Sequence, residues 1–123
     1  MALHNLFGTK GEQAAFELLL KHGYIIRERN WRSDHHEVDI IAEKGNLLIF
    51  VEVKTRREPV YDINEVITRK KISNLIAAAN AYIAIHSLHH DIQFDVILLT
   101  GENENDFTVE YIEDAFRAPL RSY

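Results

Sequence analysis

The chain is organised around residues 37–54, which read Glu37-Val38-Asp39-Ile40-Ile41-Ala42-Glu43-Lys44-Gly45-Asn46-Leu47-Leu48-Ile49-Phe50-Val51-Glu52-Val53-Lys54. Two runs rich in β-branched and other apolar residues flank a short polar segment, a pattern typical of two strands joined by a tight turn. Gly45 can supply the positive φ that a short hairpin loop usually needs. The stretch therefore predicts a β-hairpin.

Three charged side chains fall on one face of this hairpin. Side chains alternate between the faces of a strand, and the expected register pairs Glu43 with Asn46. In that register Asp39, Glu52 and Lys54 share one face near one end of the strands. Diagonal neighbours lie roughly 7–8 Å apart at Cα. Two such carboxylates can reach one divalent cation, whose oxygen ligands lie at about 2.0–2.6 Å.

The strands are apolar on both faces. The face opposite the carboxylates carries Val38, Ile40, Ala42, Leu47, Ile49, Val51 and Val53. Strands with two apolar faces are central strands covered by helices. Charges at the end of such strands are costly unless they are paired or bind a metal. The alternative to a metal site is a Glu52–Lys54 ion pair beside a solvated Asp39.

Length and composition indicate an ordinary globular protein. The chain has 123 residues, 46% of them hydrophobic and 27% charged, and we expect one domain over residues 1–123. It has no cysteine, which excludes disulfides, thiolate nucleophiles and zinc ribbons and fits a reducing cytoplasm. We also expect no signal peptide and no membrane span, because no long apolar run occurs.

The net charge of −5 disfavours a nucleic-acid partner, but the charge is unevenly distributed. Residues 101–114 hold six acids and no Lys or Arg. Nine bases fall in three clusters: Arg27, Arg29 and Arg32; Lys54, Arg56 and Arg57; and Arg69, Lys70 and Lys71. Basic clusters at turns and strand ends can contact phosphates, although each cluster also fits an ordinary solvated surface.

A first helix is predicted before the hairpin. Thr9 and Glu12 fit a capping box, with Thr9 as N-cap of a helix that runs to about His22. The capping box gives Glu12 a structural explanation. A metal ligand from the first helix is the functional alternative, and the residues leave both open.

The remaining elements follow from periodicity and turn signals. We expect an edge strand over 24–31, a second helix that begins between residues 64 and 68 and ends near 86, and strands over 92–100 and 107–111. Asp95 is the one charge inside the fourth strand. We expect it to be the structural partner of a nearby arginine.

The order helix, three strands, helix, strand, together with Asp39…Glu52-Val53-Lys54, resembles the restriction-endonuclease-like fold, an α/β fold with a central mixed β-sheet and flanking helices. A wider set of motifs resembles the YraN family of bacterial proteins, or uncharacterised protein family 0102, over nearly the whole chain. The motifs are Gly11-Glu12, Gly23-Tyr24, Arg29-Asn30-Trp31-Arg32, Glu37-Val38-Asp39-Ile40-Ile41-Ala42, Phe50-Val51-Glu52-Val53-Lys54-Thr55-Arg56 and Phe94-Asp95-Val96. That family in turn resembles archaeal Holliday junction resolvases.

The resemblance implies a set of roles. It assigns Glu12, Asp39 and Glu52 to Mg²⁺ or Mn²⁺ binding and makes Lys54 the catalytic lysine beside Asp39 and Glu52. Glu37 and Thr55 match the motifs as supporting residues. For contact with nucleic acid we expect Arg32, Arg56, Arg57, Arg69, Lys70 and Lys71. A homodimer is implied by the junction-cutting relatives, and the sequence leaves it open.

We therefore expect a metal-dependent endonuclease that hydrolyses phosphodiester bonds in structured or branched DNA. Two alternatives remain open at this point. One is a non-catalytic nucleic-acid-binding or adaptor domain with a nuclease fold. The other is a metal-dependent hydrolase of a different phosphate ester.

Overall fold

The computed structural model describes residues 3–118, which form two α-helices, one 3-10 helix and five strands. In chain order these are α1 (Leu3–Lys21), β1 (Ile25–Ser33), β2 (His36–Lys44), β3 (Leu47–Arg56), η1 (Ile63–Glu65), α2 (Arg69–His86), β4 (Asp91–Asn103) and β5 (Asp106–Phe116). The predicted αβββαβ order is confirmed, and the last strand is longer than expected. Of the helices described, neither is long and apolar enough to cross a membrane.

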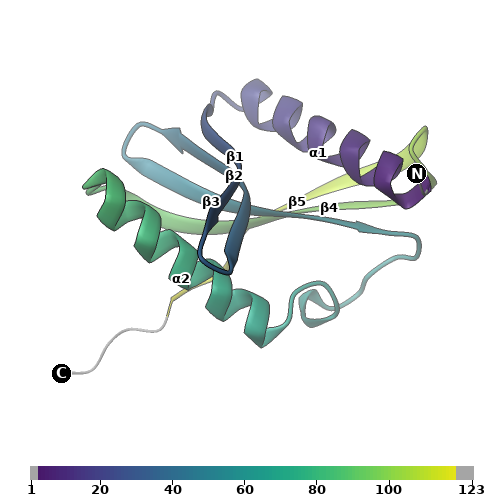
Figure 1. Ribbon diagram of the computed structural model, residues 1–123. Helices are drawn as coiled ribbons and strands as arrows, with labels where there is room; N and C mark the ends of the chain where they lie inside the picture. The colour runs from purple at the N-terminus through teal and green to yellow at the C-terminus, as the bar shows by residue number, and fades with distance from the viewer. Residues whose placement is uncertain (1–2, 119–123) are drawn as a thin grey trace.

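The five strands form one mixed sheet in the order β1-β2-β3-β4-β5. Strands β3 and β4 are parallel, and the other neighbours are antiparallel. The prediction that β1 lies at an edge is confirmed. Figure 1 shows α1 along one face of the sheet and α2 along the other. Strand β3 therefore lies at the centre of the sheet, covered from both sides.

The sheet separates two hydrophobic clusters. Beneath α2 lie Val38, Ile41, Leu48, Phe50, Leu75, Ala78, Ala79, Tyr82, Phe94, Val96 and Leu98, together with Val66 and Ile67. Beneath α1 lie Ala15, Leu19, Tyr24, Ile40, Ala42, Ile49, Val51, Ile97 and Leu99. The predicted two-sided burial of the hairpin is thus confirmed. Each Val, Leu, Ile or Phe side chain that is fully buried here contributes roughly 1.5–3 kcal/mol.

Val38 is an exception to the expected alternation. We predicted it on the same face as Ile40, but it packs in the cluster beneath α2. Asn30 of β1, which has a positive φ of 52°, lies between residues paired with Val38 and Ile40. The β2–β3 ladder also begins only at Ile40. The strand is therefore irregular at Asp39, and alternation does not carry through it.

The central hairpin has a different register from the one predicted. Lys44 pairs with Leu47, so the loop consists of Gly45 and Asn46 and the expected Glu43–Asn46 pair does not form. Gly45 has φ of 58° and occupies the first loop position, where two-residue loops accept glycine. A shift of two residues leaves the side chains of the paired residues 40–44 and 47–51 on their predicted faces.

Helix α1 begins at Leu3, so Thr9 lies inside it and the predicted capping box is wrong. Gly11 lets this helix lie close to the sheet. A Cβ atom added at Gly11 would lie 3.2 Å from Cγ2 of Thr55 and 3.3 Å from Cδ1 of Leu99. The next residue, Glu12, is thereby held near the end of β3 that carries the predicted site.

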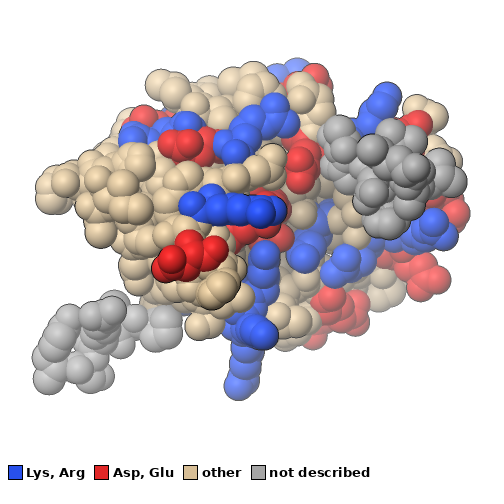
Figure 2. Space-filling model, in the orientation of Figure 1, with Lys and Arg blue, Asp and Glu red and all other residues tan. Residues whose placement is uncertain are grey.

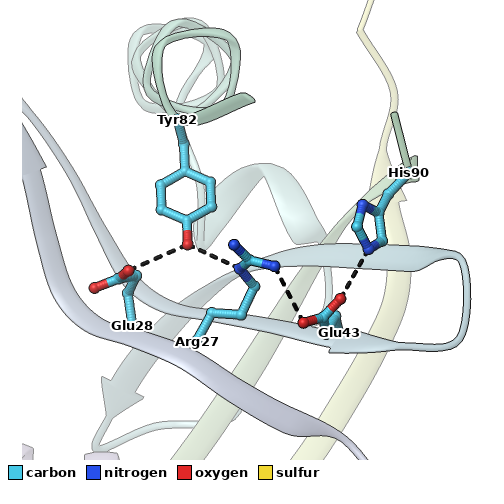
Figure 3. A network of polar contacts seen from close by, with 5 residues as sticks. All are labelled: Arg27, Glu28, Glu43, Tyr82 and His90. Carbon is cyan, nitrogen blue, oxygen red and sulfur yellow. Dashed lines mark hydrogen bonds and ion pairs between the residues drawn. The ribbon is translucent and has the colours of Figure 1, made fainter. Parts of the chain in front are cut away.

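Helix α2 is fixed at both ends. At its start the Thr68 side chain accepts a hydrogen bond from the backbone N–H of Lys71, at 3.1 Å. Towards its end the buried hydroxyl of Tyr82 accepts from Nε of Arg27 at 2.9 Å and donates to Glu28 at 3.1 Å (Figure 3). These bonds tie α2 to β1 and set which part of the helix faces the end of β3.

The same network continues to His90, the residue before β4. Arg27 also bonds Oε1 of Glu43 at 3.1 Å, and Nε2 of His90 lies 2.8 Å from Oε2 of that carboxylate (Figure 3). Both partners hold the pKa of Glu43 below its ordinary value, with His90 the larger cause. The end of the sheet opposite the predicted site is therefore cross-linked by polar contacts.

Asp95 has different partners from those expected. No arginine bonds it within the described residues. Its side chain accepts hydrogen bonds from the hydroxyl of Tyr111, from the backbone N–H of Asp114 at 2.9 Å and from Gln93 at 3.0 Å. The β4–β5 register shifts at this point, and Asp114 has a positive φ. Asp95 therefore accepts a hydrogen bond from a backbone N–H at an irregularity in β5.

The close contact at Gly11 allows the packing of α1 against the sheet to be tested. Gly11→Val should lower the unfolding free energy by about 1–3 kcal/mol, because its methyl groups would collide with Thr55 and Leu99. Equilibrium urea unfolding measures this, with Gln13→Val at an exposed position of the same helix as control. Equal midpoints for the two variants would contradict the packing described.

Candidate functional site

The predicted site lies where β2 and β3 separate. The last pair of their ladder is Ile40 with Val51, and the next step would set Asp39 opposite Glu52. Oδ2 of Asp39 accepts a hydrogen bond from the backbone N–H of Val53 at 2.8 Å. A side-chain carboxylate thus takes a β3 donor at the point where the strands part, which brings it beside Glu52.

Glu52 is a buried carboxylate between two lysines. Its residue is only 4% exposed. Nζ of Lys54, two positions along β3, lies 3.7 Å from Oε1, and Nζ of Lys71, from α2, lies 3.4 Å from Oε2. Oε2 makes no hydrogen bond within the described part of the chain. Glu52 is therefore held by the charges of Lys54 and Lys71 and by its contact with Asp39.

Burial raises the pKa of both carboxylates. Burial is the largest cause that raises the pKa of Glu52 to about 7, followed by the charge of Asp39, and the two lysines oppose the shift. Burial also raises the pKa of Asp39, while the hydrogen bond from Val53 opposes it. Two adjacent carboxyls with raised pKa values are typical of sites that receive a cation or a proton.

Glu12 approaches this pair from α1 without joining it. Burial, followed by the charge of Asp39, raises the pKa of Glu12, and a hydrogen bond with the Asn30 side chain opposes the shift. In the part of the chain that the structure describes, no three His, Cys, Asp or Glu side chains gather closely enough to hold a metal ion. The structure therefore brings Asp39 and Glu52 together and leaves Glu12 at the margin.

Asn30 is a site neighbour that the sequence did not predict as a functional residue. It lies in β1 across from Asp39, with a left-handed φ of 52°, and its side chain bonds Glu12. Asparagine tolerates this conformation better than most residues. Its place in the motif Arg29-Asn30-Trp31-Arg32 was the available signal.

Glu37 and Thr55, which were predicted to support the site, have different surroundings. Glu37 of β2 pairs with Arg32, 3.6 Å away, and its charge contributes to the raised pKa of Asp39. Thr55 turns its methyl group towards Gly11 of α1. Glu37 thus adds negative charge near the carboxylates, whereas Thr55 helps to position α1.

The predicted nucleic-acid-binding residues surround the site unevenly. Arg57, Arg69 and Lys70 are exposed on the segment between β3 and the first turn of α2. Arg56 bonds the carbonyl of Thr55, at 3.0 Å. Figure 2 shows Lys and Arg side chains gathered over the middle of one face and continuing over the start of α2, with acidic side chains among them.

Lys71 is the residue whose place differs most from expectation. We predicted it as one of three equivalent bases at the start of α2, but its ammonium lies against Glu52. Helical spacing turns Lys71 away from its neighbours Arg69 and Lys70, and this spacing was the signal in the sequence. The site thus contains two lysines where the resemblance implied one.

The donor set fits a hard divalent cation. Mg²⁺ is bound in proteins by one or two carboxylates, completed by waters and substrate phosphates, so a third protein ligand is not required. Asp39 and Glu52 supply two adjacent carboxylates, and Oε2 of Glu52 is buried without a hydrogen bond. Glu12 could add a further oxygen by turning from Asn30.

A hollow of about 650 Å³ elsewhere does not contain this site. It is lined by residues of α2 and of the first part of β4, among them Ile76, Ile83 and Ile92. None of the predicted site residues lines it. The carboxylates and lysines lie instead at the other end of β3, beside the exposed bases that follow it.

Fold and site together define an α/β protein whose central mixed sheet carries a carboxylate pair where β2 and β3 separate, flanked by one lysine from β3 and one from α2. The chain belongs to the uncharacterised protein family UPF0102, whose profile matches residues 11–99. The family membership predicted from the motifs is confirmed.

The similarity extends over the full length of named relatives. A UPF0102 protein of Bacteroides fragilis is 43% identical over 121 residues, covering 98% of this chain and 99% of that protein. One from Bacteroides thetaiotaomicron is 44% identical with the same coverage. One from Flavobacterium psychrophilum is 41% identical over 117 residues, covering 94% of this chain and 98% of that protein.

The raised pKa of Glu52 predicts a pH-dependent stability. The folded chain holds the proton up to about pH 7, whereas the unfolded carboxyl has its ordinary pKa of 4.5. Folded protein therefore binds more protons between these values, and the unfolding free energy falls as pH rises through this window. Glu52→Gln removes the ionised form and should stabilise the fold by about 1–3 kcal/mol at pH 8, with little effect at pH 5.

Thermal and urea unfolding at the two pH values measure the difference. Glu58→Gln, at an exposed loop position, is the matched control and should show no such dependence. A Glu52→Gln variant that is less stable than the wild type at pH 8 would contradict the electrostatic account.

Proposed function

We propose that this protein is a Mg²⁺- or Mn²⁺-dependent endonuclease with a restriction-endonuclease-like fold, which hydrolyses phosphodiester bonds in structured or branched DNA. The observation that carries the proposal is the buried Glu52 beside Asp39 at the split end of β3, with Lys54 at 3.7 Å. Carboxylates that share a cation next to an ammonium are the parts that phosphoryl chemistry uses.

The order of elements supports the proposal, because helix, three strands, helix and strand match the order on which the resemblance rests. The charge distribution supports it as well. Exposed bases lie at the end of β3 and at the start of α2, beside the carboxylates. The acids of residues 101–114 lie on the last part of β4 and on β5, and β4 separates β5 from β3.

Each site residue has a role in this proposal. Asp39 and Glu52 hold the cation, with Glu12 assisting from α1. When bound, the cation supplies Lewis acidity to the phosphoryl group and lowers the pKa of its water. Lys54 orients the attacking water or stabilises the negative charge that develops on the phosphoryl oxygens. The flanking bases hold the phosphate backbone in place.

One observation favours the second candidate, a non-catalytic nucleic-acid-binding or adaptor domain. Among the described residues, no three potential ligands gather around one point. In that case the bases would bind DNA with a steep salt dependence and without turnover. Carboxylates placed where phosphate must approach weigh against this candidate, because they repel the ligand.

Cleavage of a labelled four-way junction, beside single-stranded and linear duplex DNA, tests the proposal in Mg²⁺ and in Mn²⁺. Asp39→Asn and Lys54→Ala should each lower cleavage by at least about 10²-fold, the size expected when a group acting on the developing charge is lost. The thermal stability of Asp39→Asn should stay unchanged or rise, because one of two adjacent carboxylates loses its charge. Lys54→Ala removes a counter-charge of Glu52 and should lower the stability slightly above pH 7.

Lys21→Ala, at an exposed position at the end of α1, is the control for loss of a lysine and should leave cleavage unchanged. Unaltered cleavage in both site variants would reject this assignment of the site. Absence of cutting in every condition, together with salt-sensitive DNA binding, would favour the adaptor function. Parallel assays on RNA and on small phosphodiesters distinguish DNA cleavage from hydrolysis of another phosphate ester.

A further inference from the structure

Lys71 lies beside Glu52, one of the two carboxylates of the site. Its Nζ is 3.4 Å from Oε2 of Glu52, the oxygen that is buried and makes no hydrogen bond in the described part of the chain. The ammonium thus occupies the place beside Oε2 that a cation bound to Glu52 would take.

The other site lysine is placed differently. Lys54 lies on the same strand as Glu52 and contacts the opposite oxygen, Oε1, at 3.7 Å. It can therefore stay in place when Oε2 receives another partner. Lys71 cannot, because a cation bound to Oε2 would meet its ammonium at short range and repel it.

The backbone of Lys71 is held in place, whereas its ammonium group can reorient. Its backbone N–H donates to the capping hydroxyl of Thr68 at 3.1 Å, which holds the first turn of α2. Its side chain is 33% exposed, and the long lysine stem lets the ammonium turn to solvent without moving the helix. Turned outward, it would join the exposed Arg69 and Lys70.

We propose that Lys71 is the built-in counter-ion of the site: a divalent cation entering between Asp39 and Glu52 displaces its ammonium, which then contacts a substrate phosphate. This inference rests on the proposed function and deepens it. It predicts that the cation and Lys71 compete for one place. It also makes the phosphate-binding surface more positive when the cation is present.

The first test measures cation binding in the absence of nucleic acid, by calorimetric titration of the protein with Mn²⁺. Lys71→Met should bind Mn²⁺ about tenfold more tightly than the wild type, the usual size of a coupling between two competing groups. Lys71→Arg retains the positive charge and should bind close to the wild type. Lys70→Met removes an exposed charge from the same helical turn and should change the affinity by less than about twofold.

The second test is the salt dependence of junction binding in a Lys54→Ala background. Addition of Lys71→Met should reduce the slope of log K against log salt by about one when Mn²⁺ is present and should leave it unchanged without Mn²⁺. Lys70→Met, whose charge is exposed in both states, should lower the slope equally under the two conditions.

Several outcomes would overturn the inference. Mn²⁺ affinity that is unchanged or weaker in Lys71→Met rejects the counter-ion role, as does a wild-type protein that binds no Mn²⁺. A slope that does not respond to Lys71→Met in Mn²⁺ rejects the phosphate contact. Tighter Mn²⁺ binding by Lys71→Met, in a protein that cuts no substrate, leaves the counter-ion role supported and rejects the endonuclease.

Discussion

The hydrogen bond from the backbone of Val53 to the carboxylate of Asp39 lies where the β2–β3 ladder stops. A backbone donor in the middle of a sheet needs a partner, and here a side chain provides it. That bond keeps Asp39 beside Glu52 against the repulsion of two carboxylates. The lysines that reach Glu52 then come from β3 itself and from α2, while Glu12 comes from α1.

The two helices position different parts of this arrangement. Tyr82 and Thr68 fix the line of α2, and that line brings Lys71 to Oε2 of Glu52. Gly11 sets how closely α1 lies over the end of β3. Since α1 and α2 pack in separate clusters on opposite faces of the sheet, the site is assembled from layers that touch mainly through the central strands.

Much of this could be predicted from the sequence, because the signals were local. The hairpin, the order of elements and the two-sided burial of β2 and β3 follow from periodicity and turn residues. The hairpin register was wrong by two residues because Lys44-Gly45 and Gly45-Asn46 are both acceptable loops. The predicted start of α1 was wrong because a capping pattern, here Thr9 to Glu12, also occurs by chance inside a helix.

The predictions that were wrong concern features that depend on contacts between distant segments. Asp95 bonds residues of β5 at an irregularity that no local pattern marks, and Val38 changes face where Asn30 adopts a left-handed conformation. Lys71 belongs to a run of three bases. Helical spacing indicates that it turns away from the other two, but only the fold shows that it meets Glu52. A residue's partner therefore proved harder to predict than its element.

The two edges of the sheet differ in charge. Strand β1 carries Arg27, Arg29 and Arg32 beside a single acid, Glu28, whereas β5 carries Asp106, Glu110, Glu113 and Asp114 without a Lys or Arg. Arg27 and Arg32 form ion pairs with Glu43 and Glu37 of the neighbouring strand β2, so the β1 edge is close to neutral. The β5 edge therefore carries an excess of negative charge, and an approaching polyanion is repelled from that edge more strongly than from the opposite one.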